Sequence, residues 1–158
     1  PMCHLALMNR IHIRRASIDD LGLISPLFDL YRQFYEQDSD VAKAEKFLAQ
    51  RLQHHESVIF LAFDGADAVG FTQLYPGFSS VSMARTFLLN DLYVLASHRR
   101  HGAGALLLKA AVAHAQSAQA VRISLTTNVA NTTAQAVYEA QGWAREQAFL
   151  TYNFKLNP

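Results

Sequence analysis

The sequence has 158 residues, of which 51% are hydrophobic and 17% charged, and 14 basic against 13 acidic side chains leave a formal net charge of +1. This length suits a single domain with a substantial core, and the composition is typical of a globular protein, not a disordered one. The balanced charge argues against a nucleic-acid-binding protein, which usually carries a clustered basic face. The single cysteine, Cys3, excludes an internal disulfide. We find no signal peptide and no apolar run that could span a bilayer, so we expect a cytoplasmic protein.

The first half of the chain is expected to contain three strands and two helices. In chain order they are a strand over 10–16, helices over 18–35 and 41–55, and strands over 58–63 and 68–75. Ser17 is a suitable cap for the first helix, in which Pro26 marks a kink or a break. A hairpin turn is predicted at Asp64-Gly65, and Pro76-Gly77 is expected to end the strand that follows.

The second half of the chain is expected to contain four strands and two helices. They are a strand over 85–95, a helix over 102–116, a strand over 121–127, a helix over 131–141 that Asn131 caps, and closing strands over 142–147 and 149–155. The predicted order, βααβββαβαββ, is that of an α/β fold with a mixed sheet.

The stretch from Asp91 to Leu108 joins an apolar strand, a glycine turn and a helix without interruption. Glycines let backbone N–H groups approach a phosphate closely, and the first turn of a helix offers unpaired N–H donors and a favourable dipole. Arg99 and Arg100 add positive charge. The phosphate-binding Walker motif, G-x-x-x-x-G-K-[ST], is absent. The dinucleotide-binding motif, G-x-G-x-x-G, does not match because Leu107 stands at the position of its third glycine. The stretch therefore predicts an anion site of another class.

Two strings in the second half point to one family. Arg99, Gly102 and Gly104 spell R-x-x-G-x-G, which resembles the pyrophosphate-binding motif of the GCN5-related N-acetyltransferases (GNAT). Residues 131–143 resemble the later signature of the same family, N-x-x-A-x-x-[LV]-Y-x-x-x-G-[FW]. The resemblance covers roughly residues 10 to 156 and extends, at residues 31–35 and 89–92, to the Hpa2-type branch.

The resemblance implies a GNAT-like fold, whose mixed, mostly antiparallel central sheet is flanked by helices. It implies one acyl-CoA N-acyltransferase domain over 1–158 and acetyl-CoA as co-substrate. Residues 1–8 match no element well, and we expect them to be a loose end or an expression remnant. Backbone groups of the strand would pair with the pantetheine arm like an added strand, and the glycine loop would hold the pyrophosphate. The expected cofactor-binding residues are Leu92, Tyr93, Val94, Arg99, Arg100, His101, Gly102, Ala103, Gly104, Asn131 and Tyr138.

Two side chains are candidates for the chemistry. In the family resemblance, Tyr138 donates a proton to the departing thiolate; the alternative is a ring that packs in the core. Asp91 is a candidate base or amine ligand, and the alternative is a solvent-facing strand residue. Polyamine-acetylating relatives have a glutamate before this aspartate, whereas this chain has Asn90.

The acceptor side is less sharply defined. Tyr31, Tyr35 and Glu36 fall where family members shape the acceptor pocket, and their alternative is core packing with one surface charge. Three functions stay open: an N-acetyltransferase acting on a small primary amine in a ternary complex, a protein lysine acetyltransferase, and a silent acyl-CoA-binding module. No covalent acyl-enzyme is expected.

Two further expectations concern metal and assembly. The histidines lack the companion ligands of a metal site, so no metal is predicted. In the last segment Leu150, Tyr152, Phe154 and Leu156 alternate with polar residues. Such a strand presents an apolar face that a second copy can cover, which favours a homodimer; the alternative is a strand buried in its own sheet.

Overall fold

The structure is a computed structural model that describes residues 10–158. The expectations for residues 1–8 and Cys3 lie outside these described residues. The chain divides into two compact units, Pro1–Leu125 and Thr126–Pro158, and each is described by itself.

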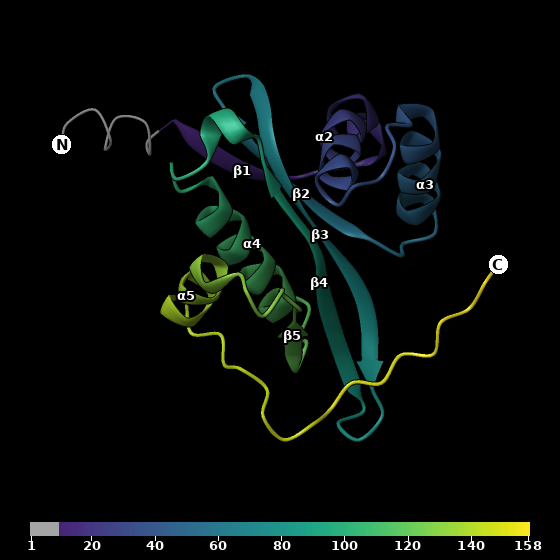
Figure 1. The fold of residues 1–158 in the computed structure, drawn as a ribbon, viewed down its shortest axis with the longest axis vertical. Coiled ribbons are helices and arrows are strands. Elements are labelled where there is room, and N and C mark those ends of the chain that lie inside the picture. Colours follow the sequence, from purple (N-terminus) through teal and green to yellow (C-terminus); the bar gives the residue numbers. More distant parts are fainter. Residues whose placement is uncertain (1–9) are drawn as a thin grey trace. The chain divides into compact units, whose positions relative to one another are not determined.

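The first unit is built on a five-stranded sheet in the order β1-β2-β3-β4-β5 (Figure 1). Neighbouring strands are antiparallel except β4 and β5, which are parallel. The strands are β1 (Ile11–Arg15), β2 (Val58–Asp64), β3 (Asp67–Ser79), β4 (Ala84–Val94) and β5 (Arg122–Ser124). The predicted mixed, mostly antiparallel sheet is therefore confirmed.

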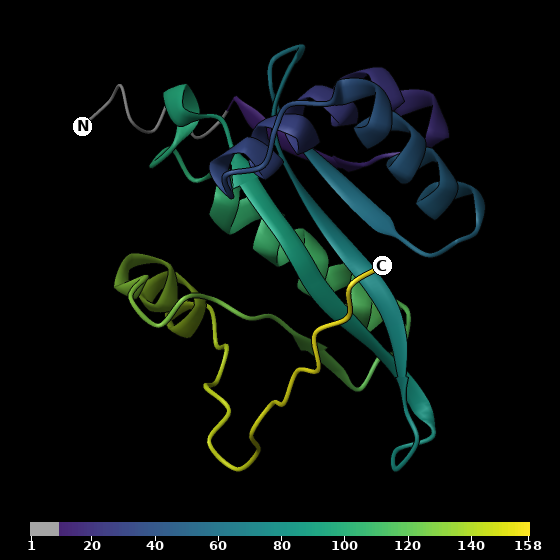
Figure 2. The same ribbon diagram turned by 45° about the vertical axis from the view of Figure 1, so that its right-hand side comes forward.

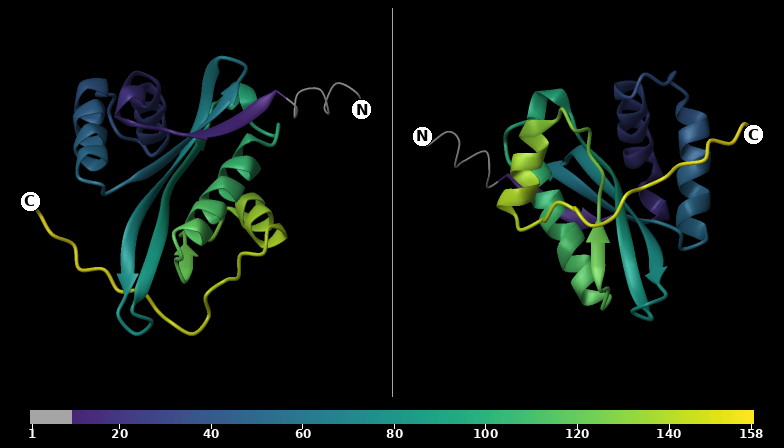
Figure 3. Two further views of the ribbon diagram at one scale, coloured as in Figure 1. Left: turned by 180° about the vertical axis from the view of Figure 1, so that it is seen from behind. Right: turned by 60° about the horizontal axis from the view of Figure 1, so that its bottom comes forward.

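Helices cover both faces of this sheet. They are α2 (Leu21–Phe34), α3 (Val41–Gln53) and α4 (Ala103–Ser117). The first two lie together on one face and α4 lies on the other, as the views from opposite sides show (Figures 1 and 3). Ser17 and Asp20 form a capping box on the short 3-10 turn that leads into α2. The helix continues through Pro26 instead of breaking there.

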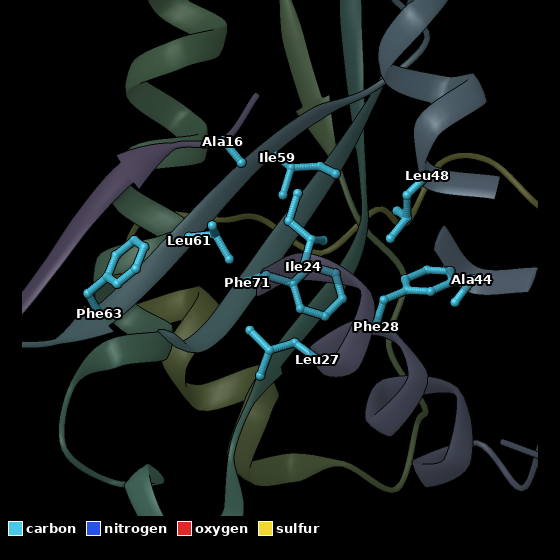
Figure 4. Close-up of a cluster of buried hydrophobic side chains, with 10 residues drawn as sticks. All are labelled: Ala16, Ile24, Leu27, Phe28, Ala44, Leu48, Ile59, Leu61, Phe63 and Phe71. Carbon is cyan, nitrogen blue, oxygen red and sulfur yellow. The ribbon is translucent and has the colours of Figure 1, made fainter. Parts of the chain in front are cut away.

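Each face of the sheet has its own apolar cluster. The larger cluster joins α2 and α3 to the sheet and includes Ile24, Phe28, Leu48, Leu61 and Phe71 (Figure 4). The smaller one sets Ala103 and Leu107 of α4 against Ala62 and Val69. Both clusters belong to the first unit, so both faces of its sheet are covered.

The prediction that Pro76-Gly77 ends a strand is wrong, because β3 continues to Ser79. The pairing of β2 with β3 stops where Val58 meets Leu74, whereas the pairing of β3 with β4 continues through Pro76 and Gly77. Beyond Leu74, no described strand pairs with the side of β3 that faces β2. A proline has no N–H group to donate, but on this unpaired side no ladder hydrogen bond is lost. The β3–β4 hairpin therefore extends well past the other strands (Figure 2).

The second unit contains one helix, α5 (Thr132–Ala140), followed by an extended segment. The predicted strands over 142–147 and 149–155 are not formed. A strand needs a neighbour for its N–H and C=O groups, and no described strand pairs with these residues. The predicted strand over 121–127 is likewise reduced to the three residues of β5, so the observed order is βααβββαβα.

Candidate active site

The strand β4 separates from β5 halfway along its length. Its pairing with β5 covers only Thr86 to Leu88, whereas its pairing with β3 continues to Val94. The backbone groups of the last six residues of β4 on the β5 side therefore have no strand partner among the described residues. Such an edge can pair with a peptide-like ligand as an added strand would.

A β-bulge changes the direction of side chains in the middle of β4. Gln73 pairs with Asp91 and Leu74 pairs with Leu89, so Asn90 is an extra residue in the ladder. In a regular strand, residues an even number apart share a face. Here, however, the Phe87 ring lies 5.3 Å from that of His114 on α4, whereas the Tyr93 ring lies 6.4 Å from that of Tyr31 on α2. The bulge thus turns Asp91 and Tyr93 towards α2.

The glycine loop delivers the start of α4 close to the free edge of β4. Gly102 caps the helix in the left-handed conformation, with φ of +87°, and no acidic residue lies in the first turn. A Cβ added at Gly104 would meet only Val94 Cγ2, at 4.0 Å, so the protein itself does not fill this space. The N–H groups of a first helical turn, the helix dipole and open space are together suited to a phosphate.

The two arginines of the loop behave differently. Arg99 Nε donates to the carbonyl oxygen of Val94 at 3.0 Å, and its guanidinium lies over the rings of Phe34 and Tyr93 at 5.7 and 5.6 Å. Arg99 is therefore engaged by β4 and α2, whereas Arg100 is exposed with a φ of +66°. The half-buried His101 precedes the helix cap.

Asp91 is a buried carboxylate in a network of amides. Its side chain is 1% exposed; Gln73 Nε2 donates to Oδ2 at 2.5 Å and Asn90 Nδ2 to Oδ1 at 2.6 Å. The Ser57 hydroxyl donates in turn to Gln73 Oε1 at 2.6 Å. Burial raises the pKa of Asp91 above its usual range, and hydrogen bonds from Asn90, Gln73 and Tyr31 oppose this rise. The alternative of a solvent-facing strand residue is wrong.

Sequence reasoning missed Gln73 and Ser57 as members of this network. Gln73 is the one amide in the apolar run from Val69 to Tyr75, and an amide inside a buried strand requires a polar partner. That signal predicts a partner but does not say which. Only the pairing of β3 with β4 identifies it as Asp91.

The predicted acceptor residues are partly brought together around Asp91. The half-buried Tyr31 hydroxyl donates to the Asn90 carbonyl oxygen at 3.4 Å, and burial together with the Asp91 charge raises its pKa. The Tyr35 ring packs against that of Tyr31 at 5.1 Å. Glu36 lies after the end of α2 with an exposed side chain and a φ of +62°. It takes no part in the described contacts of Asp91.

A broad pocket of about 610 Å³ lies between α3, the turn that follows it and the β3–β4 hairpin. Its lining includes the aromatic side chains of Phe47, Tyr75 and Phe78 and the charged side chains of Arg51, Glu56 and Arg85. Burial and the charge of Asp91 raise the pKa of the Tyr75 phenol, and Arg51 opposes the rise. Tyr75 therefore interacts electrostatically with both the Asp91 carboxylate and the Arg51 guanidinium.

The second unit holds the two remaining predicted residues. Asn131 Oδ1 accepts from the Ala134 N–H at 3.2 Å, which confirms it as the cap of α5, and Tyr138 is half-buried with its ring 6.2 Å from that of Trp143. Seven residues, or about two helical turns, separate Asn131 from Tyr138, so both lie on one side of α5.

Two features are absent from residues 10–158. Histidine, cysteine and carboxylate side chains do not gather there in threes that could hold a metal ion. The helices of the same residues are each too short or too polar to cross a membrane.

Comparisons with known proteins agree with one another. The sequence model of the Acetyltransferase (GNAT) family matches residues 24–143. The chain is 46% identical over 142 residues to YhfO, an uncharacterized N-acetyltransferase of Bacillus subtilis (strain 168), covering 90% of this chain and 95% of the relative.

Solved structures show the same likeness. The crystal structure of a probable acetyltransferase matches with a TM-score of 0.88 and 40% identity, over 93% of this chain and 99% of the other. An aminoglycoside acetyltransferase, meta-AAC0020, from an uncultured soil metagenomic sample shares the fold at 19% identity and a TM-score of 0.82, over 94% and 98% of the two chains. By its sequence and its fold, this chain belongs to the GNAT family and is an acetyltransferase.

Proposed function

We propose that the protein transfers an acetyl group from acetyl-CoA to a primary amine of a small molecule, by direct attack while both are bound. The observation that carries this proposal is the position of Asp91. It is a buried carboxylate with a raised pKa on the free half of β4. A group of that kind is suited to accept a proton beside a peptide-like binding edge.

The residues of the first unit fit a CoA ester. Backbone groups of Leu92, Tyr93 and Val94 on the free edge would pair with the pantetheine amides. The N–H groups from Gly102 through Ala103 to Gly104 would hold the pyrophosphate, with Arg100 and His101 beside them. In the second unit, Asn131 would hydrogen-bond the pantetheine arm. Acetyl-CoA itself supplies the acetyl group activated as a thioester.

The proposed roles of the side chains follow from proton balance. An alkylamine with a pKa of about 10.4 is protonated at pH 7, and removing its proton costs roughly 4.6 kcal/mol. Asp91 takes that proton, directly or through a water molecule, as the N–C bond forms. The C–S bond breaks, and the departing thiolate receives a proton from Tyr138. The raised pKa of Asp91 makes it a stronger base than an exposed aspartate.

An acetylation screen tests the proposal. The purified protein is incubated with acetyl-CoA and a panel of alkylamines, amino acids, polyamines, an aminoglycoside and basic peptides, and thiol release is measured. We expect turnover with small amines. Turnover with peptides alone identifies a protein lysine acetyltransferase, and binding of acetyl-CoA without any turnover identifies a silent binding module; both contradict the proposal.

Binding of acetyl-CoA is measured separately as a rise in melting temperature. At about 100 times the dissociation constant, a ligand adds about 2.7 kcal/mol to the stability of the native state. Gly104→Val should abolish this rise, because the side chain enters the space kept open at the start of α4. Gly22→Val is the matched control, since Gly22 is likewise the second residue of its helix and has open space around it. A rise that survives in Gly104→Val places the cofactor elsewhere.

We also propose that two copies associate through the last segment. Leu150, Tyr152, Phe154 and Leu156 alternate along it and are 82%, 87%, 90% and 78% exposed in the single chain. Such a row of apolar side chains is suited to pairing with a second chain. Light scattering at increasing protein concentration should show a dimer, and Tyr152→Lys should shift it towards monomer. A wild-type protein that stays monomeric at high concentration rules this assembly out.

A further inference from the structure

We propose that the pocket between α3 and the β3–β4 hairpin binds an anionic group of the acceptor, so that the amine acetylated by this protein carries a carboxylate. This inference rests on the proposed function and specifies its substrate class. It is drawn from the charged and aromatic side chains that line the pocket and from their position beside Asp91.

The pocket carries more positive than negative charge. Arg51 and Arg85 contribute two permanent cations and Glu56 one carboxylate. Arg51 Nε forms an ion pair with Glu56 Oε1 at 3.6 Å, a distance longer than a good hydrogen bond, and the side chain of Glu56 is 53% exposed. Over residues 10–158, Arg85 has no carboxylate as an ion-pair partner. Arg85 is therefore available to an anion, and Arg51 can share its charge between Glu56 and an anion because that ion pair is long and partly exposed.

Both arginines are held in place by aromatic rings. The guanidinium of Arg51 lies 4.9 Å from the ring centroid of Phe47, and that of Arg85 lies 4.8 Å from that of Phe78. A guanidinium stacked by its face keeps its N–H edge free, and that planar fork matches a carboxylate. The same rings offer apolar contact to the carbon chain of an acceptor.

The pocket adjoins the proposed base. Tyr75 lines it, and Tyr75 is two residues along β3 from Gln73, the amide that holds Asp91. Two residues of a strand span about 7 Å. Ser57, which follows the pocket residue Glu56, donates to the same Gln73. An acceptor can therefore present its amine to Asp91 while its anionic end lies against Arg51, and a second ammonium group in place of that anion would face two guanidinium groups.

A matched series of acceptors tests the inference. Each ω-amino acid is compared with the diamine and the simple alkylamine of equal chain length, so that only the distal group changes. Thiol release with acetyl-CoA gives kcat and KM, and calorimetry gives binding without turnover. We expect kcat/KM to be highest for the carboxylates at one chain length, by about 10- to 100-fold, as hydrogen bonds to charged groups contribute.

Arginine variants then assign the preference to the pocket. Arg51→Gln and Arg85→Gln should raise KM for the carboxylate acceptors by about 10-fold or more with little change in kcat, as expected when uniform binding is lost. Arg85→Glu should reverse the preference towards diamines. Arg15→Gln, an exposed arginine on β1, is the matched control and should change nothing. The acetyl-CoA-induced rise in melting temperature should survive in all of these variants.

The outcomes separate this inference from the proposed function. Acetylation that favours diamines, or that ignores the distal group, overturns the anionic pocket and leaves the acetyltransferase proposal standing. Calorimetric binding of the carboxylates that the arginine variants lose, without any turnover, supports the pocket and contradicts the proposed function. Loss of acetyl-CoA binding in Arg51→Gln assigns the pocket to the cofactor and overturns the inference.

Discussion

The two units of the chain differ in how far their apolar side chains are buried. In the first unit, Leu61, Phe71 and Ile24 are fully buried between the sheet and its helices. In the second, Leu150 and Phe154 are 82% and 90% exposed. In the first unit, alternation occurs in β1, where Ile11 and Ile13 alternate with polar residues and pack against the smaller apolar cluster. Alternation therefore specifies an apolar face, whereas burial requires a second element to cover it.

The largest expected effect concerns Tyr138, which tests whether the second unit contributes a catalytic group although its apolar side chains are exposed. Tyr138→Phe keeps the ring and removes only its proton donor. We expect kcat to fall roughly 10²- to 10⁴-fold, the range for loss of a general acid, with the melting temperature and acetyl-CoA affinity unchanged. Steady-state kinetics and thermal unfolding measure both. Turnover within a factor of about three of the wild type makes Tyr138 a packing residue.

The next prediction concerns Asp91, a proposed catalytic group that is buried in the first unit. Asp91→Asn keeps the shape of a buried side chain and removes its charge, so we expect kcat to fall by a similar factor, roughly 10²- to 10⁴-fold. The uncharged amide avoids the desolvation that raises the pKa of Asp91. Its NH2 group, however, faces one of the two amides that donate to Asp91, so the change in stability at a single pH combines two opposite effects.

The pH dependence of Asp91 has a definite sign. A carboxyl group with a raised pKa in the folded state contributes stability that is fully present below its unfolded pKa, about 3.9, and is lost as the pH rises through the folded value. The melting temperature of Asp91→Asn relative to that of the wild type should therefore be higher at pH 7 than below about pH 4. A relative melting temperature that instead decreases as the pH rises from about 4 to 7 would show that the ionised network stabilises the fold.

A pair of equal truncations tests the contrast in burial directly. Leu61→Ala leaves a cavity in a fully buried site and should cost about 2–5 kcal/mol of unfolding free energy. Leu150→Ala removes the same atoms from an exposed site and should cost less than about 0.5 kcal/mol at concentrations where the protein is monomeric. Chemical denaturation measures both. A large cost for Leu150→Ala in the monomer would mean that the last segment is covered within its own chain.

The smallest effect concerns a local device of the first unit. Asp20 accepts from the Ser17 N–H at 2.8 Å and pairs with the Arg14 guanidinium at 2.8 and 2.9 Å, and chiefly the latter lowers its pKa to about 2. Asp20→Ala should cost roughly 1 kcal/mol at neutral pH, as loss of a helix cap does.

The sign for Asp20 is opposite to that for Asp91. A lowered pKa gives stability that is present above the unfolded pKa of about 3.9 and is lost as the pH falls towards the folded value. The difference between Asp20→Ala and the wild type should therefore shrink steeply between about pH 4 and pH 2 in denaturation curves. Asp19→Ala, at the neighbouring position, is the control. An Asp20→Ala deficit that persists unchanged at pH 2 would assign the effect to packing instead of charge.

Much of the fold could be predicted because its signals are local. The Ser17 cap, the turn at Gly65 and the glycine loop before α4 each follow from a few adjacent residues. The family motif in residues 99–104 is of this kind, and the family itself is confirmed. The end of β3 was predicted wrongly for the converse reason: whether a proline ends a strand depends on what lies beside it, not on its sequence neighbours.

The α/β class, the order of elements from β1 to α5 and the glycine loop that identifies the family could all be predicted from sequence alone. These depend on periodicity, caps and turn residues, all of which act over a few positions. The tertiary structure was needed to show that Gln73 holds Asp91, that Arg51 and Arg85 line one pocket, and that no strand within residues 10–158 pairs with the last segment. Residues 18 to 34 positions apart meet there, and no local preference specifies which buried polar group finds which partner.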